Sequence, residues 1–183
     1  MRHFLRLAQG VNVIPLLHAL AKQPNLWNQN NLRTLYPNSP HVEADDIWLR
    51  FNNDKIAEKS PIEIAHDLET INYAAWYKLP QVPPMVFDLM RLVDATRLGR
   101  VMITRLAPGK KIYSHTDGGG YADYFKRYHV ILQNLPGSNT RAENEVVCPK
   151  AGEVYWFNNN VEHEVVNHSN EDRITLIIDL RSV

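Results

Sequence analysis

The chain is poor in the features that mark several large classes of protein. Its 183 residues contain one cysteine, Cys148, which excludes an internal disulfide and suits a reducing compartment, so we expect a cytoplasmic location. The 20 basic and 20 acidic side chains balance, so net charge indicates neither a nucleic-acid partner nor an anionic membrane. No apolar run approaches the roughly 18 residues that a membrane span requires. The sequence leaves the oligomeric state open.

Residues 1–21 imitate a signal peptide, with early arginines, an apolar stretch and an Ala-Leu-Ala end. Asn12, Pro15 and His18 interrupt the apolar stretch, so we expect this segment to belong to the folded chain. The leucines that follow Pro15 have helical spacing and predict a short helix there.

Residues 1–98 are predicted to form an N-terminal region of helices and loops that packs on the core and shapes the substrate pocket. Within it, residues 45–51 (DDIWLRF) alternate like a strand, with Trp48 and Arg50 on one face. A helix is predicted to begin at Ser60-Pro61-Ile62-Glu63, which offers an N-cap, a first-turn proline and a glutamate three residues after the cap. A second helix is predicted after Pro83-Pro84.

Residues 99–183 have a different character and are predicted to form the catalytic core. Short runs rich in Val, Ile and Tyr follow one another at intervals of about ten residues, with turns between them and no helical period. The predicted strands are RVMITRL, KIYSH, RYHVILQNL, NEVVCP, GEVYWF, HEVVNH and RITLIIDLR. We therefore expect one domain, mainly β with N-terminal helices, folded as a double-stranded β-helix, the cupin-like jelly roll.

Two histidines and an aspartate are placed to bind a metal. His115 and Asp117 are two residues apart in a strand-like segment, so their side chains point the same way. His163 begins a later polar strand of the same predicted double sheet. Two imidazoles and a carboxylate form the facial triad of non-haem Fe(II) oxygenases. His168 is an alternative third ligand, although it lies on the opposite face of its strand.

Further basic groups accompany this set. Arg173 begins the last predicted strand, on the same face as Thr175, Ile177 and Asp179, and a buried arginine requires an anion because an unpaired buried charge is costly. Arg127 and His129 likewise share one strand face. A small dicarboxylate that chelates the iron would use both groups of donors.

The segments SHTD, RYHVILQNLPG, AGEVYWFNNNVEHEVVNH and RITLIIDLR, in this order, resemble the aspartyl/asparaginyl β-hydroxylase family of Fe(II)- and 2-oxoglutarate-dependent dioxygenases. The resemblance covers residues 99–181. It implies that the iron ligands are His115, Asp117 and His163. It also implies that Arg173 binds the distal carboxylate of 2-oxoglutarate with help from the Thr104 hydroxyl, and that Arg127 and His129 contact this cosubstrate.

The implied activity is hydroxylation of an unactivated C–H bond with O2, releasing succinate and CO2, and we expect ascorbate to support turnover. Two substrate classes fit: a free amino acid or related metabolite, and an Asp- or Asn-type side chain of a polypeptide. Arg50, Trp48 and Tyr121 are candidate substrate contacts, and residues 118–126 (GGGYADYFK) are a candidate lid.

Two other functions use the same residues. A cupin-type metal-dependent isomerase or hydrolase would need the three ligands but not 2-oxoglutarate, and it would leave Arg173 and Arg127 without an anion. A non-catalytic binding module would keep the fold alone, although an intact set of ligands favours catalysis.

Overall fold

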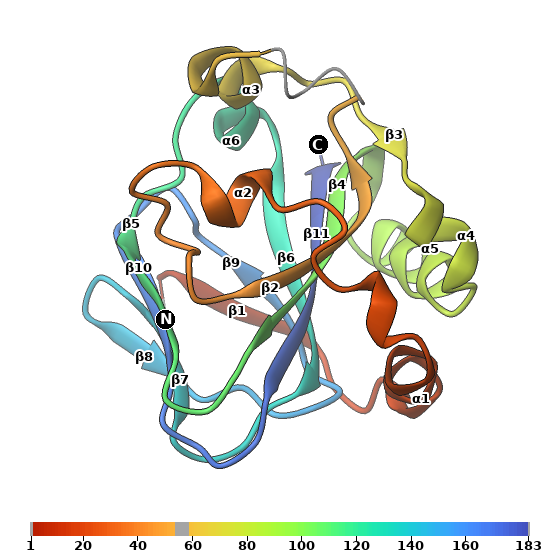
Figure 1. The fold of residues 1–183 in the computed structure, drawn as a ribbon, viewed down its shortest axis with the longest axis vertical. Helices are drawn as coiled ribbons and strands as arrows, with labels where there is room; N and C mark the ends of the chain where they lie inside the picture. Colours follow the sequence, from red (N-terminus) through yellow and green to blue (C-terminus); the bar gives the residue numbers. More distant parts are fainter. Residues whose placement is uncertain (1, 54–58, 183) are drawn as a thin grey trace.

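Two antiparallel sheets organise the chain in the computed structural model, which describes residues 2–53 and 59–182 (Figure 1). The larger sheet contains, in spatial order, β1 (Phe4–Ala8), β9 (Val154–Phe157), β6 (Lys126–Gln133), β11 (Arg173–Ser182), β4 (Ala95–Leu106), β2 (Asp45–Phe51) and β3 (Ile71–Asn72). The smaller sheet contains β5 (Lys111–His115), β10 (His163–Asn167), β7 (Ser138–Ala142) and β8 (Glu145–Val147). The predicted double-stranded β-helix is confirmed.

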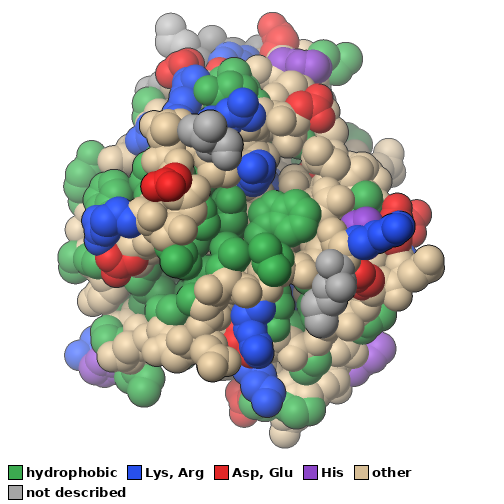
Figure 2. All heavy atoms as spheres, turned by 180° about the vertical axis from the view of Figure 1, so that it is seen from behind, with side chains coloured by type: hydrophobic (Ala, Val, Ile, Leu, Met, Phe, Trp, Pro, Cys, Tyr) green, Lys and Arg blue, Asp and Glu red, His purple; other side chains and the backbone are tan. Residues whose placement is uncertain are grey.

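Helices cover the side of the larger sheet that faces away from the smaller one (Figure 1). These are α1 (Ile14–Lys22), α4 (Ala74–Lys78) and α5 (Val82–Leu92). On this side of the molecule hydrophobic side chains also reach the surface (Figure 2), where Tyr77, Phe87 and Leu92 are exposed. Among the described residues, none of the helices has the length and apolar character needed to pass through a membrane.

The remaining helical segments are short; the first contacts α1, and the others lie toward one end of the sheets (Figure 1). They are η1 (Pro24–Leu26, a 3-10 turn), α2 (Leu32–Leu35), α3 (Pro61–His66) and α6 (Gly120–Tyr124). The predicted start of α3 is confirmed: the Ser60 hydroxyl accepts from the Glu63 amide, and the Glu63 carboxylate accepts from the Ser60 amide. Although far apart in sequence, α3 and α6 lie side by side (Figure 1).

Strand β11 separates an apolar layer from a polar one because its side chains alternate between the faces of the larger sheet. Ile174, Leu176, Ile178 and Leu180 pack in the main hydrophobic core with residues of α1, α4 and α5. The alternate residues Arg173, Thr175 and Ile177 line a small cavity together with Ile112 and Val165 of the smaller sheet. The space between the sheets is therefore where buried polar chemistry is concentrated.

The N-terminal region contributes more to the sheet than its sequence indicates. Strand β1 pairs with β9, and β2 pairs with β4, so both extend the larger sheet. Strand β4 begins at Ala95 and runs across the boundary expected between residues 98 and 99. The structure also adds β7, where no strand was expected, between β10 and β8.

Candidate active site

His115, Asp117 and His163 come together where the smaller sheet faces the larger one. His115 ends β5 and pairs directly with His163 at the start of β10, and Asp117 follows in the loop after β5. One ligand atom from each residue can be chosen so that all three lie within 4.8 Å of one another. Two imidazoles and one carboxylate at this spacing suit a divalent first-row transition metal.

Both imidazoles present the same nitrogen to the centre of this cluster. Nδ1 of His115 lies 2.7 Å from the Tyr113 carbonyl oxygen, and Nδ1 of His163 lies 2.8 Å from the Val161 carbonyl oxygen. A carbonyl only accepts, so each Nδ1 carries the proton and each Nε2 keeps its lone pair. His115 Nε2 is buried and has no hydrogen-bond partner among the described residues. Burial lowers the pKa of His163 to about 4, which keeps this side chain neutral at physiological pH.

The carboxylate of Asp117 uses its two oxygens differently. Oδ2 accepts from Arg127 at 2.5 Å and from the Asn159 amide at 2.9 Å, whereas Oδ1 lies 3.6 Å from His115 Nε2. Burial opposes ionisation, but the charge of Arg127 outweighs it and holds the pKa of Asp117 below its usual range. An ionised oxygen is therefore directed toward the two histidines.

Arg127 is fully engaged by two carboxylates. Besides Asp117, it binds Asp179 through a two-pronged contact, Nε to Oδ1 at 2.9 Å and NH2 to Oδ2 at 3.0 Å. Burial acts against its charge, yet these two carboxylates raise the pKa of Arg127 above its usual range. In this structure Arg127 holds Asp117, and its expected contact with 2-oxoglutarate stays a prediction.

Arg173, unlike Arg127, is a buried cation without a carboxylate partner among the described residues. It is 4% exposed, its NH1 has no hydrogen-bond partner, and no described carboxylate forms an ion pair with it. Burial lowers the pKa of Arg173 to about 10. His129 and Thr104 line the same small cavity, but the Thr104 hydroxyl donates to Asp46 at 2.7 Å and not to a group that assists Arg173. The hydroxyl that accepts from Arg173 is that of Thr175, at 3.4 Å.

A larger cavity of about 450 Å³ opens beside the metal-ligand cluster and is lined by His115 and Asp117. Trp48 and Tyr121, two of the three expected substrate contacts, lie in its wall. Arg50 does not: it donates to Asn72 Oδ1 and to the Thr70 carbonyl, both at 2.8 Å. The pairing of β2 with β4 skips Leu49, and this bulge reverses the alternation that would have placed Arg50 beside Trp48.

The candidate lid, residues 118–126, forms the short helix α6 and packs on α3. Gly119 has φ +87°, and a Cβ there would approach the Ala65 carbonyl oxygen to 2.7 Å, which explains the glycine at this position. Tyr121 and Phe125 are buried. Movement of this segment stays a prediction.

Several residues near the site were not singled out by the sequence. His41 lies edge-on to His115, with 4.8 Å between ring centroids, and its Nδ1 is 3.0 Å from Arg33. Arg33 and Arg100 also line the larger cavity. The Asn- and Pro-rich segment 25–41 gave no indication that Arg33 and His41 lie at the site. The position of Arg100 could have been predicted, because Arg100 is four residues before Thr104 and therefore lies on the same face of the strand. His168, the alternative ligand, is exposed and outside the cluster.

The comparisons agree with this geometry. Two solved structures share the fold. One is an oxidoreductase of the 2OG-Fe(II) oxygenase family from Burkholderia pseudomallei, with TM-score 0.54 and 15% identity over 90% of this chain and 78% of the other. The other is the viral collagen prolyl hydroxylase of Paramecium Bursaria Chlorella virus-1 in a 2OG complex, with TM-score 0.54 and 13% identity over 99% and 97% of the two chains.

No curated protein matches the chain in sequence. Residues 69–182, more than half of the chain, match the aspartyl/asparaginyl beta-hydroxylase family. The match includes the three clustered ligands and both unusual arginines, and it begins well before the stretch in which the sequence motifs were recognised. The chain therefore belongs to the aspartyl/asparaginyl beta-hydroxylase family.

Proposed function

We propose that this enzyme holds Fe(II) with His115, Asp117 and His163, binds the distal carboxylate of 2-oxoglutarate with Arg173, and hydroxylates an unactivated C–H bond of an amino-acid-like substrate. The observation that carries the proposal is the conjunction of three ligand atoms within 4.8 Å and a buried, unpaired guanidinium in the same space between the sheets. Each feature alone is common, but together they match one cofactor pair.

The residues fit an iron ion. The lone pair of His115 Nε2 is buried without a donor, which is costly unless a ligand uses it. Both Nδ1 protons are fixed by backbone carbonyls, and one oxygen of Asp117 is fixed by Arg127 and Asn159. Such support orients the ligands before a metal binds.

The residues also fit 2-oxoglutarate. Arg173 is a buried cation that a carboxylate would neutralise, and the guanidinium fork matches carboxylate geometry. His129 lines the same small cavity as Arg173. Burial, and then the charge of Arg173, lower the pKa of His129 well below its usual value. A neutral His129 can then donate or accept a hydrogen bond toward the bound cosubstrate.

Bound iron would supply the oxygen chemistry, in which substrate R–H, O2 and 2-oxoglutarate give R–OH, succinate and CO2. The chain's own part is to orient the reactants and exclude water. Arg127 fixes Asp117 and keeps it ionised, Arg173 fixes the far end of the cosubstrate, and the large cavity presents the C–H bond to the ligand cluster. O2 is the required oxidant, and we expect ascorbate to keep the iron reduced.

The substrate is proposed to be a free amino acid or metabolite in preference to an Asp- or Asn-type side chain of a polypeptide. A cavity of about 450 Å³ lies within the range of small-molecule sites. Both classes remain within the proposal, and they differ in whether a free small molecule alone supports turnover.

The experiment that tests the proposal is succinate formation from 2-oxoglutarate under air with Fe(II) and ascorbate, with pools of amino acids and of peptides. Turnover should rise with one pool and disappear in His115→Ala and Arg173→Ala, while the exposed control His168→Ala retains it. Absence of turnover together with absence of 2-oxoglutarate binding would favour a cupin-type isomerase or hydrolase, or a binding module.

A further inference from the structure

Arg100 lies in the wall of the large cavity, on the side of Trp48 and Tyr121. Its guanidinium carbon lies over two aromatic rings, 3.8 Å from the centroid of Tyr121 and 4.5 Å from that of Phe51. The Tyr121 hydroxyl also accepts from the Arg100 backbone amide at 2.5 Å. These cation–π contacts stabilise the guanidinium without using its N–H donors, which lie along its edge.

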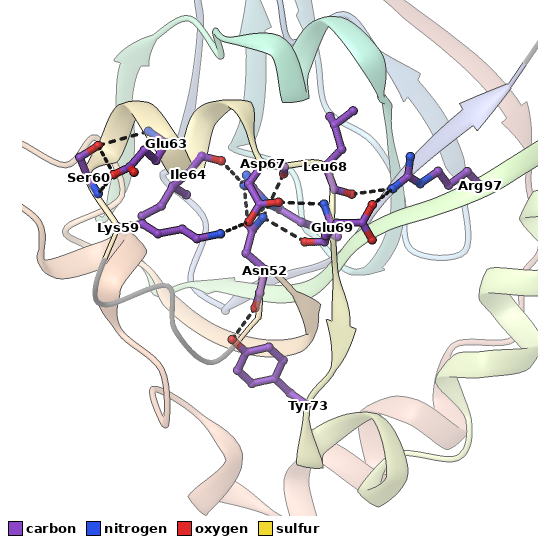
Figure 3. A network of polar contacts seen from close by, with 11 residues as sticks. Asn52, Lys59, Ser60, Glu63, Ile64, Asp67, Leu68, Glu69, Tyr73 and Arg97 are labelled. Atoms are coloured by element: carbon purple, nitrogen blue, oxygen red, sulfur yellow. Dashed lines mark hydrogen bonds and ion pairs between the residues drawn. The ribbon is translucent and has the colours of Figure 1, made fainter.

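One side of that edge is bound to neutral acceptors. Nε and NH2 donate to Asn52 Oδ1 at 2.9 and 2.6 Å, and NH2 donates to the Ile64 carbonyl at 2.9 Å. Asn52 is itself fixed, because its amide nitrogen donates to the carbonyls of Asp67 and Glu69 (Figure 3). No hydrogen bond joins NH1 to any residue that the structure describes, so this donor remains available at the cavity wall.

Arg100 differs from the other cationic side chains of the cavity in its ion pairing. Arg33 pairs with Asp46 at 2.6 Å, Lys59 pairs with Asp67 at 2.5 Å, and Arg127 pairs with both Asp117 and Asp179. Within residues 2–53 and 59–182, Arg100 has no carboxylate partner. Burial lowers the pKa of Arg100, which reflects the cost of a charge that neutral acceptors only partly compensate.

From this juxtaposition we propose that Arg100 binds a carboxylate of the substrate and makes the enzyme selective for acids over neutral analogues. The inference rests on the proposed function and names a property of its substrate. The apolar neighbours Trp48, Phe51 and Met102 would contact the body of that molecule. The buried indole nitrogen of Trp48 has no partner among the described residues and offers a further donor.

This carboxylate site is separate from the proposed 2-oxoglutarate site. Leu106, the β4 partner of Arg173, lies six residues beyond Arg100, or roughly 20 Å along the strand. Arg100 on β4 and Arg173 on β11 therefore lie far apart along two paired strands, and they line different cavities. One cosubstrate molecule cannot neutralise both, so a second anion is needed.

The test compares matched acids and amides on protein loaded with Mn(II) and 2-oxoglutarate. The probes are phenylacetate with phenylacetamide, and N-acetyl-L-phenylalanine with its amide, and the readout is the ligand-dependent rise in Tm. The acids should bind the wild type at least about tenfold more tightly than the amides. Arg100→Met should abolish this preference and Arg100→Lys should weaken it, while the control Arg97→Lys, on the same strand but outside the cavity wall, should keep it.

Equal shifts for acid and amide in the wild type, including no shift with either, would overturn the inference, as would an undiminished preference in Arg100→Met. If Arg100→Met does not fold, the inference is tested by the acid-over-amide preference of the wild type and by its weakening in Arg100→Lys. The rise in Tm caused by 2-oxoglutarate is measured first in the same samples. Its absence would count against the proposed function, whereas its presence without acid preference would count against Arg100 alone.

Discussion

Arg127 donates to one oxygen of Asp117 and leaves the other directed toward the histidines. NH1 lies 2.5 Å from Oδ2, while Oδ1 lies 3.6 Å from His115 Nε2. The same guanidinium binds Asp179, which is 1% exposed. One cation therefore pairs with two carboxylates, and the orientation of Asp117 in the cluster depends on Arg127.

Arg127→Met should destabilise the metal-free protein by about 3–5 kcal/mol, because it leaves two carboxylates buried without a cation. Without Arg127, burial would raise the pKa of Asp117, so the loss should be larger at pH 8 than at pH 5. Urea unfolding at both pH values measures this, with Arg127→Lys as the charge-conserving control. An unchanged free energy of unfolding would contradict the role assigned to Arg127.

The sequence indicated that His115, Asp117 and His163 cluster because their positions depend largely on local features, and their role as metal ligands stays a prediction. His115 and Asp117 are two residues apart, although β5 ends at His115 and Asp117 lies in the following loop and not on the expected strand face. His163 opens a strand that pairs with the strand of His115. The apolar alternation of β11 likewise predicted which side Arg173 faces. Such features depend on period and order, which a single sequence displays.

What the sequence did not predict depends on distant contacts. The segment SNTRA of β7 has few strand-favouring residues and becomes a strand because β10 and β8 flank it. Strand β1 forms because β9 offers an edge. The bulge at Leu49 has no sequence signal, and it turned Arg50 out of the cavity while bringing Phe51 against Trp48, with 3.9 Å between ring centroids.

His115→Ala should weaken Mn(II) binding at least about 100-fold, since loss of a ligand exceeds the 10–100-fold effect of losing its supporting partners. His168→Ala should leave the Kd unchanged because that side chain is exposed and outside the cluster. Calorimetric titration of the metal-free protein with Mn(II) gives both values. Equal weakening in the two variants would mean that the cluster does not hold the metal.

Arg173→Met should separate stability from cosubstrate binding. The guanidinium is buried without a carboxylate, so its replacement by an apolar side chain of similar length should leave the metal-free protein as stable or raise its free energy of unfolding by about 1 kcal/mol or more. In the Mn(II)-loaded wild type, 2-oxoglutarate at a hundred times its Kd should add about 2.7 kcal/mol. The variant should lose this stabilisation by 2-oxoglutarate. Thermal unfolding with and without 2-oxoglutarate measures it, and a variant that is still stabilised would contradict the role assigned to Arg173.

The metal-free protein should lose stability as the pH falls from about 7 to about 4, because several histidines are buried in neutral form. Burial lowers the pKa of His41, His129 and His163, that of His163 to about 4, from a model-peptide value of 6.5. Across this interval the unfolded chain binds protons that the folded chain excludes, so the free energy of unfolding decreases with decreasing pH. Urea unfolding at a series of pH values measures the slope. His129→Gln should reduce the slope while the exposed control His168→Gln leaves it unchanged, and a slope that neither variant alters would show that His129 is charged in the folded protein.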